Sequence, residues 1–128
     1  MIILNDERFN NEKIEIVFDI SSIQNTKPNS TILFSNDFDE KFIERYKYAQ
    51  KQNIEMAIKV NSIKDFIFVI NLNAKYAFCK NLELAKELQT IADNYLTQTK
   101  VILEVESFDQ IEKIAKAQID GIYIKGKK

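Results

Sequence analysis

The stretch TILFSNDFDE, residues 31–40, places a hydroxyl group and three carboxylates next to a short apolar run. Such a cluster could hold a metal ion or a phosphate, or it could mark the end of a strand and the start of a helix. Asp37 stands three residues before Glu40, which is the spacing of a capping box, and the helix dipole stabilises carboxylates in a first turn. We therefore expect Asp37 to cap a helix, and we expect no metal site.

Five polar residues form a second candidate site, which would bind an anionic metabolite. They are Asp37, Lys59, Asn61, Glu106 and Lys125. Each stands at or just beyond the end of a predicted strand, and ligands of open α/β sheets bind outside the carboxyl ends of the strands. Lys59 and Glu104 also stand inside otherwise apolar strands, where opposite charges can neutralise each other or line a small pocket. Convergence of the five side chains would favour a small-molecule receptor or enzyme.

The composition excludes several common kinds of active site. The chain has no histidine, so His-based acid–base catalysis and the usual zinc and haem sites are absent. Its two glycines, Gly121 and Gly126, are too few for a glycine-rich phosphate loop. The single cysteine, Cys79, ends an apolar strand with no histidine to activate it, so we expect a buried, unreactive thiol. No cofactor is predicted, and whether the protein is an enzyme stays uncertain, with the balance against it.

Short β-rich runs alternate with helical patterns along the chain, which is typical of parallel βαβ units. Strands are predicted at 14–20, 31–35, 54–60, 75–79, 101–105 and 121–125, and helices at about 38–52, 62–72, 82–96 and 108–118. Segment 21–30 is short for a crossover, so the first strand is either parallel or an antiparallel edge.

These elements predict a single α/β domain over residues 1–128. We expect a small three-layer sandwich with a mostly parallel sheet of five or six strands. Repeated βαβ units occur both in flavodoxin-like or receiver-like open sheets and in half-barrels. We favour the open sheet because the chain is too short for an eight-stranded barrel.

Residues 55–80 align without a gap on residues 100–125. The shared pattern is a strand, a serine, an amphipathic helix, a turn and a second strand. Ser62 and Ser107 take the same place in the two copies, so we expect both to cap a helix. One physical unit, used twice, explains the pattern.

The run FIFVI at 66–70 has too many consecutive apolar residues for one face of an exposed helix. Ile67, Phe68 and Asn71 align with three charged residues of the second copy, which mark the water-facing side of the last helix. Ile67 and Phe68 are therefore predicted to point outward, where a partner usually covers apolar surface. We expect a homodimer or a complex with another protein, centred on Ile67 and Phe68, with Asn71 at its edge.

With 18 basic and 19 acidic residues the net charge is −1, so no overall field attracts nucleic acid or an anionic membrane. No apolar run approaches the roughly 18 residues that a membrane span requires, and residues 1–10 become charged too quickly for a signal peptide. We expect a cytoplasmic protein with neither nucleic acid nor membrane as partner. Frequent Lys, Ile and Asn suggest an AT-rich bacterial genome.

Two partial family resemblances concern the region around Asp37. Segment 32–56, ILFSNDFDEKFIERYKYAQKQNIEM, is similar to the late segment of PIN-type nucleases, and IVFDISS at 16–22 is similar to their opening strand. This resemblance implies metal-dependent hydrolysis, with Asp19 and Asp37 carried over as metal-binding acids. The long helical stretch and the further acid that the family has between these segments are missing here.

Residues 32–125 also resemble a phospho-receiver domain if ILFSNDFDE is taken as its first strand. The resemblance implies that Asp37 and Asp39 would bind magnesium, and that Ser107 and Lys125 would contact the phosphoryl group. The aspartate that accepts the phosphoryl group in receivers is replaced by Cys79 or Lys80, so no acyl phosphate can form. This resemblance therefore implies a degenerate receiver-like module.

Two classes of function stay open at this point. We favour a non-catalytic protein-binding or oligomerising module with a regulatory or scaffold role. The alternative is a small-molecule binding protein or enzyme that uses the polar residues at the strand ends.

Overall fold

The computed structural model describes residues 1–35 and 37–126, and its centre is a seven-stranded sheet. The strands are β1 (Ile2–Leu4), β2 (Lys13–Ile16), β3 (Ser30–Phe34), β4 (Glu55–Lys59), β5 (Tyr76–Cys79), β6 (Lys100–Val105) and β7 (Gly121–Ile124). The helices are α1 (Ile20–Gln24), α2 (Glu40–Lys51), α3 (Ile63–Asn71), α4 (Leu82–Tyr95) and α5 (Ile111–Lys116). Every neighbouring pair of strands in this sheet is parallel, so the predicted α/β class is confirmed.

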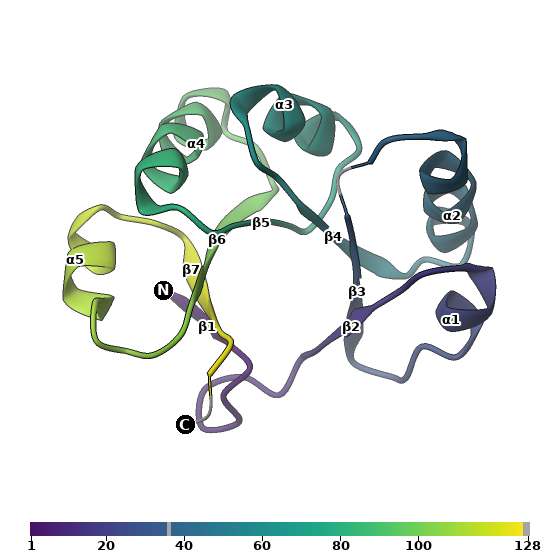
Figure 1. Ribbon diagram of the computed structural model, residues 1–128, viewed down its shortest axis with the longest axis horizontal. Coiled ribbons are helices and arrows are strands. Elements are labelled where there is room, and N and C mark those ends of the chain that lie inside the picture. Colours follow the sequence, from purple (N-terminus) through teal and green to yellow (C-terminus); the bar gives the residue numbers. More distant parts are fainter. Residues whose placement is uncertain (36, 127–128) are drawn as a thin grey trace.

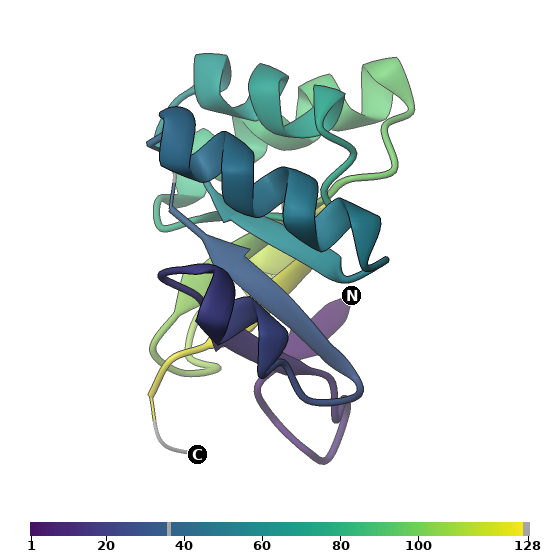
Figure 2. The ribbon, with the colours of Figure 1, turned by 90° about the vertical axis from the view of Figure 1, so that its right-hand side faces the viewer.

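The sheet curls into an open ring with the helices on its outer, convex face (Figure 1). Its strand order is β1-β7-β6-β5-β4-β3-β2, so each strand from β2 to β6 lies beside the next one along the chain. Seen from the side, α1 and α2 lie in front of the strands, on the outside of the ring (Figure 2). The molecule is thus a half-barrel.

The half-barrel differs from the favoured open sandwich in two respects. It has seven strands instead of five or six, and helices cover only one face of the sheet. A doubly wound sheet needs a point at which the strand order reverses, and in receivers the first strand lies between the second and the third. No reversal occurs between β2 and β7, so every helix falls on the same side.

Two apolar cores lie on opposite faces of the sheet, because successive side chains of a strand point to opposite sides. The larger core fills the space between the sheet and the helices, and Phe66 and Leu88 are completely buried in it. Cys79 belongs to this core, as predicted. The smaller core fills the concave side with Leu4, Leu33, Ala57, Tyr76, Phe78 and Ile102.

Strands β1 and β2 are the two edges of the curled sheet, and residues 5–12 connect them (Figure 1). The side-chain amide of Asn5 donates a hydrogen bond to the carbonyl of Ile124 at 2.6 Å. The buried carboxylate of Asp6 accepts from the Arg8 guanidinium at 2.6 Å, and that guanidinium lies over the rings of Phe9 and Phe108. The connection is therefore an ordered segment that spans the gap in the ring.

The predicted strand 14–20 is shorter than expected, and it is parallel to its neighbour. It ends at Ile16, pairs with β3, and is followed by α1, a helix that the sequence analysis missed. The carboxylate of Asp19 caps this helix by accepting from the Ser22 N–H at 2.7 Å. The five residues of α1 are too few for a periodic pattern, yet they supply the crossover that a parallel pair requires. Strand β1, with three residues, was missed for the same reason.

One of the two predicted serine caps is present. The Ser62 hydroxyl accepts from the Asp65 N–H at 3.1 Å and caps α3. The prediction for Ser107 is wrong, because α5 starts only at Ile111 and the Ser107 hydroxyl accepts from the Asp109 N–H at 3.3 Å in the preceding turn.

The capping role predicted for Asp37 belongs to Asp39. The Asp39 carboxylate accepts from the Phe42 N–H at 2.8 Å, whereas Asp37 accepts from the Ser35 hydroxyl at 3.0 Å. Phe38 between them has a positive φ of 51°, which turns the chain and places the helix start two residues later than the capping-box spacing indicated. The capping box was therefore a coincidence of spacing.

Replacing Asp39 by Ala should lower the free energy of unfolding by about 0.5–2 kcal/mol, because the first turn of α2 loses its cap. The matched variant, Asp37→Ala, should change it by less than about 0.5 kcal/mol. Urea unfolding followed by circular dichroism measures both changes. Equal losses in the two variants would show that Asp39 is not the residue that caps α2.

Candidate functional site

The carboxyl ends of the strands form the mouth of the half-barrel. Leu33, Ala57, Phe78, Ile102 and Tyr123 contact the concave core. A position two residues further along a strand faces the same side of the sheet. The mouth is therefore lined by Ser35, Lys59, Lys80, Glu104 and Lys125. Barrels of parallel strands bind their ligands at this end.

The structure divides the five predicted ligand residues into three groups. Asp37 and Lys59 line one pocket of about 420 Å³, together with Arg45. The ammonium of Lys125 lies 3.6 Å from the Glu106 carboxylate, in an exposed ion pair. Asn61 donates its backbone N–H to the Asp65 carboxylate at 2.9 Å, at the start of α3. None of the pockets found among the described residues holds all five side chains.

Glu104 is the one acidic residue among the five positions that line the mouth. One of its carboxylate oxygens, Oε2, is buried and has no hydrogen-bond partner among the described residues. Burial, together with the charge of Glu104, raises the pKa of Tyr123. Burial raises the pKa of Cys79 to about 12, so this thiol does not ionise near neutral pH. A nucleophilic role for Cys79 is therefore not supported by its surroundings.

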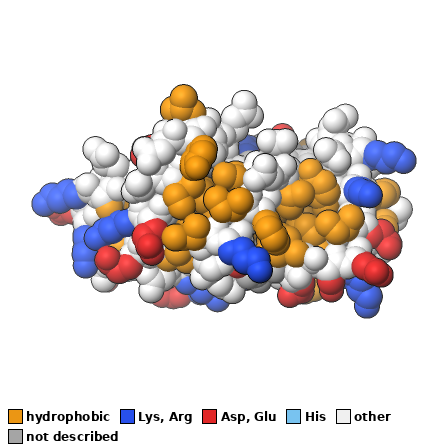
Figure 3. Space-filling model, turned by 90° about the horizontal axis from the view of Figure 1, so that it is seen from above, with side chains coloured by type: hydrophobic (Ala, Val, Ile, Leu, Met, Phe, Trp, Pro, Cys, Tyr) orange, Lys and Arg blue, Asp and Glu red, His pale blue; other side chains and the backbone are white. Residues whose placement is uncertain are grey.

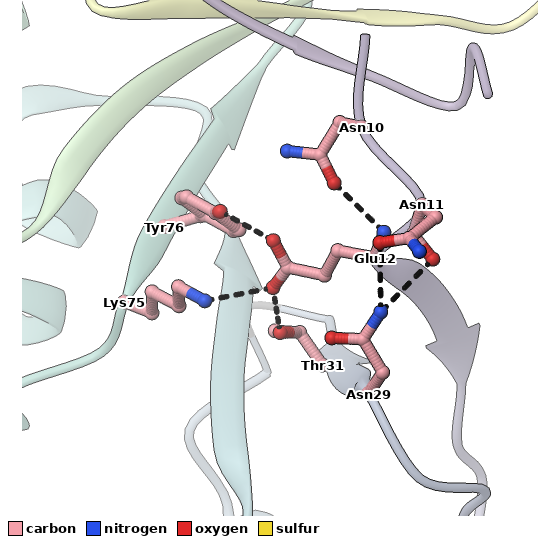
Figure 4. Close-up of polar contacts among 7 residues, drawn as sticks. All are labelled: Asn10, Asn11, Glu12, Asn29, Thr31, Lys75 and Tyr76. Carbon is pink, nitrogen blue, oxygen red and sulfur yellow. Dashed lines mark hydrogen bonds and ion pairs between the residues drawn. The ribbon is translucent and has the colours of Figure 1, made fainter. Parts of the chain in front are cut away.

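At the opposite end of the half-barrel, the Glu12 carboxylate accepts three hydrogen bonds (Figure 4). Its Oε1 accepts from the Tyr76 hydroxyl at 2.7 Å, and its Oε2 accepts from the Lys75 ammonium at 2.9 Å and from the Thr31 hydroxyl. Thr31 belongs to β3 and Tyr76 to β5, whereas Lys75 directly precedes β5. Glu12 thus ties segment 5–12 to two strands of the sheet.

Asparagine side chains hold the backbone around Glu12 in place. The Asn10 side-chain oxygen accepts from the Glu12 N–H at 2.7 Å. The Asn29 amide donates to the carbonyl of Asn11 at 3.2 Å and to its side-chain oxygen at 3.0 Å. These contacts are also drawn in Figure 4. The side chain of Glu12 is therefore positioned by residues on both sides of it.

The contacts of Glu12 favour its ionised form. Burial raises the pKa of the carboxyl, but the hydrogen bonds from Thr31, Lys75 and Tyr76, with the charge of Lys75, outweigh burial and lower it. Burial and the Glu12 carboxylate together raise the pKa of Tyr76 well above its ordinary value. At neutral pH the cluster consists of a carboxylate, an ammonium and two neutral hydroxyls.

Cavities of about 730 and 700 Å³ lie beside this cluster, and Glu12 lines both. Its two oxygens are already engaged by three donors, which leaves little capacity to take a proton from a substrate. Residues at the amino ends of barrel strands usually serve stability. We therefore assign the Glu12 cluster to closing the gap between β1 and β2.

The outer surface of α2, α3 and α4 carries apolar side chains (Figure 3). Ile63, Ile67 and Phe68 of α3 are 39%, 37% and 42% exposed, and the Phe68 ring contacts the Phe38 ring edge-to-face with their centroids 5.3 Å apart. Asn71 is exposed and donates its side-chain amide to the Ile67 carbonyl at 2.7 Å. Ile67 and Phe68 thus reach the surface, and their role in an interface stays a prediction.

Sequence reasoning missed Glu12 and Arg45. Glu12 meets Thr31, Lys75 and Tyr76 only in the folded chain, and its position before a strand was the one signal available. Arg45 of α2 lines the pocket of about 420 Å³ that also contains Asp37 and Lys59, which we call the mouth pocket. In the sequence, a basic residue on a helix is typical of a solvated helix face.

Among residues 1–35 and 37–126 there is no group of three or more Cys, Asp or Glu side chains placed to hold a metal ion. In the same part of the chain, every helix is too short or too polar to cross a membrane. The chain matches no protein family model, and no curated protein is significantly similar to it in sequence.

Proposed function

We propose that the protein is a non-catalytic protein-binding module that associates with a second copy of itself through α3. The observation that carries this proposal is the exposure of Ile63, Ile67 and Phe68 on one short helix. Covering these side chains removes apolar surface from water, which favours association. We also propose that the protein is cytoplasmic, as expected from its sequence.

The charges on either side of α3 favour a second copy as the partner. Helix α2 carries four basic and two acidic residues, whereas α4 carries three acidic residues and one basic residue. Helix α3 itself has one of each sign. The two helices that flank α3 therefore carry net charges of opposite sign, which favours association with a suitably rotated copy of the same face.

The direction of the two-fold axis follows from this pattern. In Figure 1, α3 lies between α2 and α4 on the outside of the ring. A two-fold axis parallel to α3 lays α2 of one copy against α4 of the other, which pairs opposite charges. An axis across α3 would lay α2 against α2 and bring like charges together. We therefore expect the first arrangement, with Ile67 and Phe68 near its centre and Asn71 at its edge.

Sedimentation velocity from low to high micromolar concentration should show a monomer–dimer equilibrium, weakened by salt because charges of opposite sign face each other. The double variant Ile67→Glu with Phe68→Lys should stay monomeric over the same range and keep its circular dichroism spectrum. The matched control makes the same two changes elsewhere: Ile16→Glu with Phe18→Lys, at positions 59% and 70% exposed on and just after β2. This control should dimerise like the native protein.

A native protein that stays monomeric at high micromolar concentration would refute self-association. A double variant that unfolds while the control folds would show that Ile67 and Phe68 belong to the core. Equal dimerisation of all three proteins would place the interface on another surface.

A further inference from the structure

We propose that the mouth pocket, formed between β2, β3, β4 and α2, binds a small organic anion with an apolar body. The proposal is independent of self-association through α3. The pocket holds about 420 Å³, which is within the range of small-molecule sites, and it lies at the carboxyl ends of the strands.

Two basic side chains from different elements line this pocket. Lys59 follows Ile58 of β4, which pairs with Phe34 of β3, so Lys59 and Ser35 lie side by side on the concave face. Arg45 reaches the pocket from α2. Neither Lys59 nor Arg45 forms a salt bridge with another described residue, whereas Lys75 and Lys125 both do. The pocket therefore offers two cations that are available to an anion.

Acidic residues near the pocket limit the charge that it can accept. Asp37 lines it, with its carboxylate accepting from the Ser35 hydroxyl at 3.0 Å. The pKa of Asp19 is lowered by hydrogen bonds from Ser22 and also by the charge of Arg45, so that guanidinium lies near a second carboxylate. The pocket thus suits a ligand with one anionic group more than a polyanion.

The rest of the lining is apolar and includes side chains that stay exposed among residues 1–35 and 37–126. Ile16 is 59% exposed and Phe18 is 70% exposed, and the buried residues Leu33 and Phe34 of β3 also line the pocket. Exposed aliphatic and aromatic side chains beside two cations match a ligand with an apolar ring or chain next to its charge. A carboxylate and a phosphate monoester share this chemistry.

The test is a titration of the full chain, labelled with ¹⁵N, followed by NMR. The probes are phenyl phosphate, phenylacetate, phenol and inorganic phosphate. Both aromatic anions should bind saturably and shift the amides of Val17, Ser35 and Lys59. Phenol and inorganic phosphate should each bind at least about tenfold more weakly than the aromatic anion that binds better. Phenol lacks the anionic group, and inorganic phosphate lacks the apolar ring. Which of the two anions binds more tightly distinguishes a phosphate ester from a carboxylate.

Lys59→Met and Arg45→Met should each weaken binding of the better anion by about tenfold or more. Phe18→Ser should reduce its affinity toward that of inorganic phosphate. The matched control is Lys80→Met, which removes an exposed lysine from the next strand along the mouth. This control should bind like the native protein, and circular dichroism should show that each variant is folded.

Amide shifts that do not saturate, or that fall on α3 and α4, would overturn the proposal. Equal affinities of the native protein, Arg45→Met and Phe18→Ser for the better anion would also overturn it. If Lys59→Met fails to fold, the Arg45 and Phe18 variants decide the matter alone. Arg45 and Phe18 lie outside α3. If no anion binds to the pocket, the outcome of the dimer experiment is therefore not affected.

Discussion

Replacing Glu12 by Gln is expected to lower the free energy of unfolding by about 3 kcal/mol at neutral pH. Removing one member of a buried ion pair commonly costs about 3–5 kcal/mol, because its partner is left without compensation. The Glu12 side chain is only 11% exposed, but Lys75 is 38% exposed and can turn toward water, which places the loss at the lower end. Chemical denaturation of the native and variant proteins measures the difference.

The difference should depend on pH in a definite direction. The folded-state pKa of Glu12 is lowered from its ordinary value of 4.5. A carboxyl of this kind contributes stability that is fully present above its unfolded pKa and is lost as the pH falls through its folded pKa. The native protein should therefore keep its full advantage over Glu12→Gln at pH 6–7 and lose it progressively below about pH 4.5.

Glu7→Gln is the matched control, because it makes the same chemical change in the same connection between β1 and β2. Glu7 is 84% exposed and lies 3.5 Å from the Lys13 ammonium. An exposed pair of this kind contributes about 0–1 kcal/mol. Similar losses in both variants, or a Glu12 effect that persists unchanged in acid, would contradict the role assigned to the Glu12 carboxylate.

Gly121→Ala should lower the free energy of unfolding by about 1–3 kcal/mol, the usual range for overpacking. A Cβ at this position would come 2.6 Å from the Ile2 carbonyl oxygen and 2.7 Å from the Ile2 Cβ. The first contact is with backbone, so β1 must move away from β7. Because β1 has three residues and lies at the edge of the sheet, we expect it to detach rather than distort β7.

Hydrogen exchange locates this effect within the molecule. The Ile2 N–H donates to the Asp120 carbonyl at 2.9 Å and should lose its protection in Gly121→Ala. Amides of β5, which lie further inside the sheet, serve as the internal control and should keep theirs. Loss of protection in both places would indicate global destabilisation, and unchanged protection at Ile2 would show that β1 accommodates the methyl group.

Most of the strands and helices could be predicted from sequence, because their apolar residues repeat with a clear period. Strands β3 to β7 and helices α2 to α4 agree with the predicted ranges to within two residues at each end. Short elements such as α1 are too short to show a periodic apolar pattern, so they were not predicted. The helix that follows β3 was predicted, but its cap was not, since the positive φ of Phe38 is a property of the backbone that spacing does not reveal.

The curl of the sheet and the Glu12 cluster could not be predicted in the same way. An open sheet and a half-barrel both require strands that are apolar on two faces, so Leu33 and Phe78 fit either arrangement. Glu12, Thr31 and Tyr76 come from three separate segments. Their contact depends on how far the ring closes, and this is set by the packing of all the strands together. The pocket that joins Lys59 to Arg45 likewise combines residues of separate elements, β4 and α2.

The place of β1 in the sheet has a consequence for the order in which the chain assembles. Strands β2 to β6 each pair with the next strand along the chain, so those pairings close short loops. The contact between Asn5 and Ile124 instead joins residues 119 apart in sequence. Within this sheet, β1 is synthesised before the other six strands but has no partner until β7 has been made. The first strand of this sheet is therefore the last to find its neighbour, and such long-range closure is slow.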